Sequence, residues 1–186
     1  RSVDPVRQEL ALEFVVHDHG GPAAAWAKNV QPGAWIGISL PGSQVDFPET
    51  CNWHLFAGDP TALPGIGARL ERLSADAKGV VLIEVANASE IFELSHPAGI
   101  VVQWLLQTES AADRSPLADA VLALDIPPAA AIYAAGEAAS MTTIRNHVRQ
   151  TLGIPREQVY VIPYWKQGAN EEIYHNQRHE FMDADE

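Results

Sequence analysis

The chain has 186 residues, of which 47% are hydrophobic, which suffices for one large or two small domains with a packed core. Its net charge of −12 argues against nucleic-acid binding and against adhesion to anionic membranes. No apolar run approaches the length of a membrane span, so we expect no membrane insertion. The single cysteine, Cys51, excludes an internal disulfide.

Residues 1–42 are expected to be rich in β structure. A hydrophobic period of two over residues 10–16 predicts an antiparallel strand with one wet face. Gly21 and Pro22 open a short helix, and residues 35–40 are typical of a second strand. Two strands and a helix cannot close a core alone, so we interpret this segment as the C-terminal part of a β-barrel that begins upstream.

After a linker over residues 42–50, apolar strands alternate with amphipathic helices, which predicts a second domain over residues 43–168. The predicted strands cover residues 53–58, 80–85, 101–107, 131–135 and 159–164, and the predicted helices cover 61–73, 115–124 and 138–152. This alternation implies an α/β fold with a parallel sheet covered on both faces, as in nucleotide-binding domains. Residues 169–186 form a polar tail that could be helical.

The most informative stretch runs from residue 53 to 70. An apolar strand leads into Gly58, and Asp59 and Pro60 then occupy capping positions before an amphipathic helix. A strand that ends in glycine at a helix N-terminus is where α/β proteins bind the phosphates of a nucleotide. No G-x-G-x-x-G is present, so these residues alone fit an ordinary βα unit equally well.

Four segments, in this order, resemble the siderophore-interacting protein family, the flavin-dependent ferric-siderophore reductases. They are HDHGGPAAAWA (17–27), WHLFAGDPTALPGI (53–66), AGEAASM (135–141) and YWKQG (164–168). The resemblance implies a ferredoxin-reductase-like fold, in which a flavin-binding β-barrel precedes a nicotinamide-nucleotide domain with a parallel sheet. The family's Arg-x-Tyr-Thr flavin motif lies upstream of the region that resembles residues 10–17. We therefore expect the chain to lack the N-terminal part of the barrel.

The resemblance also implies a cytoplasmic enzyme that uses FAD and NAD(P)H to reduce a ferric siderophore and release Fe(II). A flavin can take the two electrons of a hydride and release them singly, as Fe(III) requires. Iron is cargo of the substrate, so we expect no protein metal site and no catalytic side chain. Two alternatives remain: a flavin or ferric reductase with another acceptor, and a fragment that only binds nucleotide. The sequence does not define the siderophore or the oligomeric state.

The flavin region of the family matches the segment around the first predicted helix. A proline at the first helical position leaves the following N–H groups facing the flavin diphosphate. The tryptophan of this segment suits a place beside the cofactor and suits an ordinary core position equally well. The residues that the resemblance implies for FAD are His17, Gly21, Pro22, Ala23, Ala24 and Trp26.

Two further groups of residues match the nicotinamide-nucleotide site. Gly58, Asp59 and Thr61 are the candidates for its diphosphate. Gly136 and Glu137 end the strand that brings the nicotinamide toward the flavin, although Glu137 equally suits the N-terminus of the following helix.

A carboxylate near the end of the second strand of a dinucleotide fold binds the adenosine ribose and repels a 2′-phosphate. Glu84 holds that place, and residues 86–94 contain no Arg or Lys. The sequence therefore predicts NADH as the donor. NADPH remains the alternative, because Asn87 and Ser89 could hydrogen-bond a 2′-phosphate without charge and the family contains users of both donors.

The substrate candidates are cations, because ferric catecholates and hydroxycarboxylates are anionic. The acidic chain has three lysines, and Lys166 follows the last predicted strand, where side chains face the cofactor crevice. Arg145 is a second candidate. The His175 and His179 pair has metal-binding spacing but lacks a third ligand, and a solvated helix face is its ordinary interpretation.

Overall fold

The structure is a computed structural model that describes residues 2–14, 16, 21–38, 46–107 and 115–169. The chain forms two compact units, Arg1–Gln44 and Val45–Glu186. The predicted boundary between residues 42 and 43 and the predicted tail over 170–186 lie outside the described residues.

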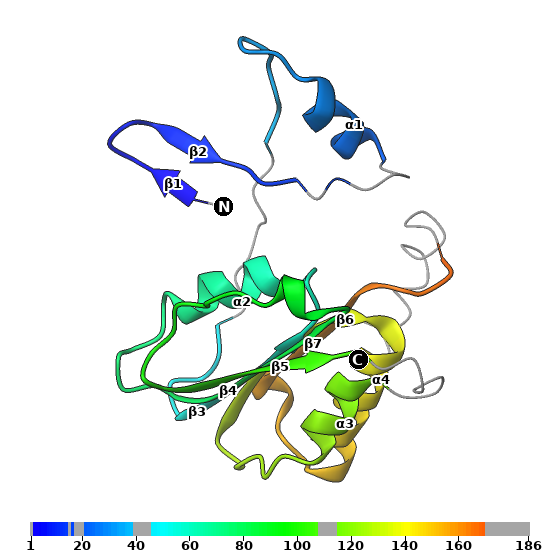
Figure 1. Cartoon of the computed structure of the whole chain (residues 1–186). Coiled ribbons are helices and arrows are strands. Elements are labelled where there is room, and N and C mark those ends of the chain that lie inside the picture. The colour runs from blue at the N-terminus through cyan, green and yellow to red at the C-terminus, as the bar shows by residue number, and fades with distance from the viewer. Residues whose placement is uncertain (1, 15, 17–20, 39–45, 108–114, 170–186) are drawn as a thin grey trace. The chain divides into compact units, whose positions relative to one another are not determined.

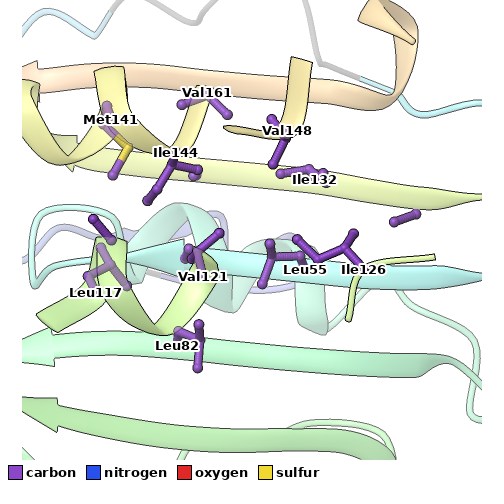
Figure 2. Packing of buried hydrophobic residues seen from close by; sticks show 14 of the residues in the cluster. Leu55, Leu82, Leu117, Val121, Ile126, Ile132, Met141, Ile144, Val148 and Val161 are labelled. Carbon is purple, nitrogen blue, oxygen red and sulfur yellow. The ribbon is translucent and has the colours of Figure 1, made fainter. Parts of the chain in front are cut away.

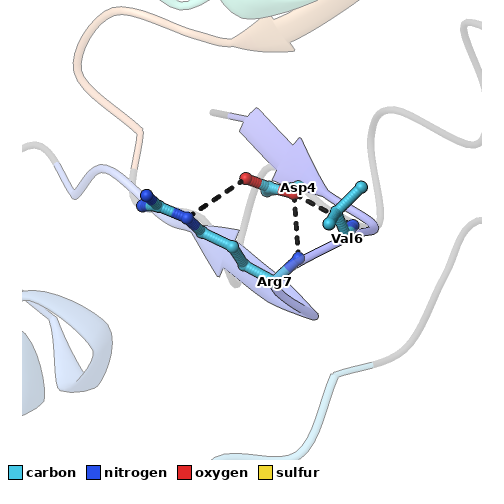
Figure 3. Close-up of polar contacts among 3 residues, drawn as sticks. All are labelled: Asp4, Val6 and Arg7. Atoms are coloured by element: carbon cyan, nitrogen blue, oxygen red, sulfur yellow. Dashed lines mark hydrogen bonds and ion pairs between the residues drawn. The ribbon is translucent and has the colours of Figure 1, made fainter.

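The N-terminal unit begins with a small hairpin of strands β1 (Ser2–Asp4) and β2 (Glu9–Ala11), which pair antiparallel. Asp4 holds the connecting turn: its Oδ1 accepts the backbone N–H groups of Val6 and Arg7, each at 3.0 Å (Figure 3). The Nε of Arg7 lies 3.9 Å from Asp4 Oδ2, an exposed ion pair that contributes little by itself. Aspartate side chains commonly stabilise turns by accepting hydrogen bonds from backbone N–H groups of the residues that follow.

Helix α1 (Pro22–Asn29) begins at the predicted proline. The predicted strand over residues 10–16 is only partly correct, because β2 ends at Ala11, and residues 35–38 form no strand. A strand persists only along a partner, and in the described part of this unit β2 pairs with a β1 of three residues.

The C-terminal unit contains a five-stranded parallel sheet in the order β5-β4-β3-β6-β7 (Figure 1). This confirms the predicted parallel α/β fold. Every predicted strand is present, and β3 has the predicted bounds, whereas the other four differ by one or two residues at their ends. The strands are β3 (Trp53–Gly58), β4 (Lys78–Val85), β5 (Gly99–Leu106), β6 (Ala130–Glu137) and β7 (Val159–Trp165).

Helix α2 (Leu63–Leu70) covers one face of the sheet, and α3 (Pro116–Leu122) and α4 (Ala138–Asn146) cover the other (Figure 1). A π-helical turn, His147–Thr151, continues α4, so together they span nearly the predicted 138–152. Two short 3₁₀ turns occur at Ala88–Glu90 and Arg156–Gln158.

Both faces of the central strands are buried, as a parallel sheet requires. Leu55 on β3 packs with Val121 of α3 and Ile144 of α4, all without exposed surface (Figure 2). The next residue, Phe56, points to the opposite face, where it packs with Ile66 of α2. Each such side chain contributes about 1.5–3 kcal/mol through burial, which makes the sheet a rigid platform for the turns at its edge.

Candidate functional site

The carboxyl ends of three neighbouring strands bring the central candidates together. The chain runs outward from β3 through β4 to β5 and then returns to β6 on the other side of β3. The point where strand order reverses is where open α/β sheets bind ligands. Gly58 pairs with Ala135 across this point, and Glu137 pairs with Trp165 on β7. We call residues 58, 59, 136, 137, 165 and 166 the carboxyl edge.

Gly58 is glycine because the protein itself fills the space around it. A Cβ atom here would lie 2.4 Å from the Cβ of Ala62 and 2.6 Å from the carbonyl oxygen of Ala135. Only glycine lets the turn before α2 pack against β6 this closely. Packing thus accounts for this glycine, and its contact with the diphosphate stays a prediction.

Asp59 is buried, with 7% of its surface exposed, and accepts hydrogen bonds from four donors. Its Oδ1 accepts the backbone N–H (2.8 Å) and the hydroxyl (2.5 Å) of Thr61. Its Oδ2 accepts the backbone N–H of Glu137 (3.0 Å) and the indole N–H of Trp165 (2.7 Å). With four protein donors on its two oxygens, Asp59 holds the turn together, and its contact with the diphosphate stays a prediction.

The same contact explains why α2 begins at Leu63 and not at the predicted residue 61. The N–H of Thr61 bonds to the Asp59 side chain, and the N–H of Ala62 bonds to the Asp59 carbonyl oxygen at 2.9 Å. These bonds close a turn over residues 59–62 before helical geometry starts.

Gly136 fits against Asp59 through a backbone conformation that favours glycine. Its φ is +152°, and a Cβ atom would lie 2.5 Å from Asp59 Oδ2. Any larger residue would push the Asp59 carboxylate away from the end of β6.

Glu137 caps the N-terminus of α4, which is the structural alternative raised by the sequence. Its Oε2 accepts the N–H groups of Ala139 (2.6 Å) and Ser140 (3.3 Å), and its Oε1 accepts the N–H of Gln167 (3.3 Å). The carboxylate therefore stabilises the helix start and also joins it to the segment after β7.

The two substrate candidates are separated by the fold. Lys166 is exposed and directly follows Trp165, so it belongs to the carboxyl edge. Arg145 lies in the last turn of α4, seven residues or about 10 Å along the helix from its start. The structure thus groups Lys166 with the candidate site and places Arg145 away from it.

Glu84, the predicted ribose contact, lies against the start of α3. Its side chain is buried, and Oε2 accepts the Ser115 hydroxyl (2.5 Å) and the Leu117 N–H (2.8 Å) at the start of α3. Its Oε1 accepts the side-chain N–H of Gln107 at 3.1 Å. The carboxylate faces the N-terminus of α3 and stabilises that helix, and its contact with the adenosine ribose stays a prediction.

The flavin candidates lie in the N-terminal unit, except that His17 is outside the described residues. Gly21 caps α1 with its backbone, and in the described residues no side chain bonds to this helix start. Ala23 is exposed in its first turn, whereas Ala24 is buried. Trp26 packs on Phe14 with ring centroids 5.7 Å apart, which supports the core interpretation of this tryptophan.

Sequence reasoning did not identify Trp165 and Gln167 as members of the site. Trp165 donates its indole N–H to Asp59 and Gln167 donates its backbone N–H to Glu137. Their partners lie 106 and 30 residues away. Both residues belong to the segment YWKQG that resembles the family, and this was the signal that could have identified them.

An aromatic cluster on the α2 face was also missed. The guanidinium of Arg69 lies 4.4 Å from the ring centroid of Tyr133, whose hydroxyl is 3.0 Å from that of Tyr164. Burial, and then the bond to Tyr133, raise the pKa of Tyr164 well above its ordinary value. Tyr164 therefore stays neutral at physiological pH and supplies no charge to the carboxyl edge.

Within the ranges that the structure describes, no helix is long and apolar enough to span a bilayer, and no three metal-ligating side chains converge. A five-stranded parallel sheet with tight glycine turns at its switch point defines an α/β domain of the dinucleotide-binding architecture.

Comparisons with known proteins define the family. The model described as "Siderophore-interacting protein" matches residues 51–168, and the model described as "Siderophore-interacting FAD-binding domain" matches residues 1–45. The chain therefore belongs to the siderophore-interacting protein family, as the resemblance predicted.

Individual relatives agree. Ferric vibriobactin reductase ViuB of Vibrio cholerae is 39% identical over 180 residues, 95% of this chain and 66% of that protein. The NADPH-dependent ferric-chelate reductase of Escherichia coli is 34% identical over 113 residues, 59% of this chain and 44% of that protein. The crystal structure of the siderophore-interacting protein SipS from Aeromonas hydrophila superimposes with a TM-score of 0.78 at 36% identity, over 91% of this chain and 67% of that chain. The chain thus spans 66% of the length of ViuB.

Proposed function

We propose that the protein is an FAD-containing NAD(P)H:ferric-siderophore oxidoreductase. The observation that carries this proposal is the carboxyl edge: a strand-order switch point with an exposed lysine, in a chain 39% identical to a ferric vibriobactin reductase. In the balanced reaction, one NAD(P)H gives up a hydride and reduces two Fe(III) to two Fe(II), with release of one proton. Fe(II) binds hard oxygen ligands less tightly than Fe(III) does, so the chelate loosens.

The residues of α1 fit FAD. The helix start has Gly21 as its cap, and a Cβ there would meet no atom of the described residues within 4 Å, so a phosphate could approach the N–H groups of Ala23 and Ala24. Bound flavin would supply the conversion between two-electron and one-electron transfer. This chain's part is to hold the diphosphate at that helix start.

For the nicotinamide nucleotide, the proposed contacts are the exposed Thr61 and the backbone of the turns at Gly58 and Gly136. Asp59 and Glu137 shape these turns, because their carboxylates are bonded to protein donors. The proposed donor is NADH: the 3₁₀ turn after β4 carries Glu90, and residues 86–94 contain no cation. The Escherichia coli relative is named NADPH-dependent, so a higher kcat/KM for NADPH would overturn this choice.

Lys166 is proposed to bind the anionic ferric chelate. Its matched control is Lys78, an exposed lysine at the amino end of β4 and hence at the opposite edge of the sheet. Eight residues of strand span about 26 Å, several Debye lengths at physiological salt, so the two lysines act independently on a ligand.

The test measures steady-state Fe(II) formation from ferric citrate by the flavin-loaded protein. Lys166→Ala should raise the KM for ferric citrate about fivefold and leave the KM for the nicotinamide unchanged. Lys78→Ala should change neither KM. Equal KM values for ferric citrate in both variants would remove Lys166 from the site. The predicted cytoplasmic location remains a prediction.

A further inference from the structure

One buried carboxylate joins the turns of three strands. Asp59 follows β3, and its Oδ2 accepts the backbone N–H of Glu137 at the end of β6 and the indole N–H of Trp165 at the end of β7. The four donors around Asp59 are all neutral groups. Because these donors occupy both carboxylate oxygens, Asp59 fixes the positions of Thr61, Glu137 and Trp165 relative to one another.

These contacts hold the residues on both sides of Lys166, Trp165 through its side chain and Gln167 through its backbone N–H. Trp165 is held by Asp59 at 2.7 Å, and the N–H of Gln167 is held by Glu137 Oε1 at 3.3 Å. Glu137 is in turn bonded to Asp59 through its own N–H. The residue that carries the proposed substrate-binding cation thus lies between two tethers, both of which lead back to one carboxylate.

We infer that Asp59 is a positioning residue, which acts through Trp165 and Glu137 to hold Lys166 where an anionic ferric chelate meets it. The inference rests on the proposed function of Lys166. Only a carboxylate can do this, because each of its two oxygens accepts two hydrogen bonds. Asparagine offers one acceptor oxygen, so its amide N–H groups would face the donors of either Thr61 or the Glu137 and Trp165 pair.

The test compares Asp59→Asn and Trp165→Phe in the flavin-loaded protein, with ferric citrate as the chelate. Trp165 is 37% exposed, so Trp165→Phe should remove the indole N–H with little loss of stability. This variant tests the inference even if Asp59→Asn does not fold. Each change should raise the KM for ferric citrate about threefold, no more than Lys166→Ala does. Asp76→Asn is the control, because Asp76 is an exposed carboxylate at the amino end of β4 and should leave this KM unchanged.

Double variants separate positioning from a general structural effect. In the Lys166→Ala background, Asp59→Asn and Trp165→Phe should produce no further rise in the KM for ferric citrate, because they act through a side chain that is absent. The same threefold rise in both backgrounds would overturn the inference. If the single variant Lys166→Ala leaves the KM for ferric citrate unchanged, the proposed role of Lys166 is wrong, and the inference about Asp59 is wrong with it. If Lys166→Ala raises this KM but Asp59→Asn and Trp165→Phe do not, only the inference about Asp59 is wrong.

A spectroscopic readout tests the contact itself. The indole N–H resonance of Trp165, assigned by its loss in Trp165→Phe, should shift in Asp59→Asn because the charged acceptor is gone. An unchanged resonance would overturn the inference whatever the kinetics show.

Discussion

Replacement of Glu84 tests whether this carboxylate supports the fold or recognises the donor. Three donors converge on it, from Ser115 (2.5 Å), Leu117 (2.8 Å) and Gln107 (3.1 Å), and it is 8% exposed. Hydrogen bonds to a charged group contribute about 1.5–3 kcal/mol each when the partner is lost. The cost is reduced here because the N–H of Leu117 also lies 3.1 Å from the Ser115 hydroxyl oxygen. We therefore expect Glu84→Ala to lower the free energy of unfolding by about 3 kcal/mol.

Glu84→Gln should cost less, about 1 kcal/mol, because the new amide oxygen can still accept from Ser115 and Leu117. The Gln107 side chain can then turn so that its oxygen accepts an N–H of the new amide. Urea unfolding followed by circular dichroism measures both values, and kcat/KM for NADH and NADPH is measured on the same preparations. The ratio of the two kcat/KM values should stay within about twofold of the unsubstituted protein. Unchanged unfolding together with a tenfold gain for NADPH would refute this reasoning and support the ribose contact.

Gly58→Ala should lower the free energy of unfolding by about 1–3 kcal/mol, because the new Cβ overlaps Ala62 and Ala135. Gly67→Ala is the control and should raise it by about 1 kcal/mol, because a Cβ at this position in α2 meets no described atom within 4 Å. Equal effects of the two changes in urea unfolding would contradict the packing explanation of Gly58. Burial lowers the pKa of His54 below its unfolded value of about 6.5, so the unfolded chain binds the proton more readily. Stability from His54 is complete above pH ~6.5 and is lost as the pH falls toward the folded pKa. His54→Gln should weaken this loss between pH 7 and 5, and identical pH profiles would show that His54 contributes none of it.

The sheet domain was largely predictable because its signals are local. The apolar run over residues 53–58 gave the bounds of β3, and Ser115 with Pro116 marked the start of α3. Strand order was not predicted, because periodicity records which residues are buried and not which strands are neighbours.

The site was predictable only in part, because its connections are long-range. The sequence identified Asp59 as a turn residue, but the donors that define its role lie at residues 137 and 165. Glu84 illustrates the opposite failure: the sequence shows an acidic residue in a strand, but not that its side chain faces α3. The predicted strand over residues 10–16 was longer than β2, and residues 35–38 form no strand, because strand formation depends on a partner that local sequence does not reveal.

We propose that the protein passes electrons from NAD(P)H to ferric chelates with the help of bound FAD. The most direct measurement follows the absorbance of the flavin-loaded protein under anaerobic conditions, first with NADH or NADPH and then with ferric citrate and an Fe(II)-specific indicator. We predict that the nicotinamide bleaches the flavin absorbance, and that ferric citrate restores it with two Fe(II) formed per nicotinamide oxidised. A flavin that the nicotinamide does not bleach, or a bleached flavin that ferric citrate does not reoxidise, would contradict the account.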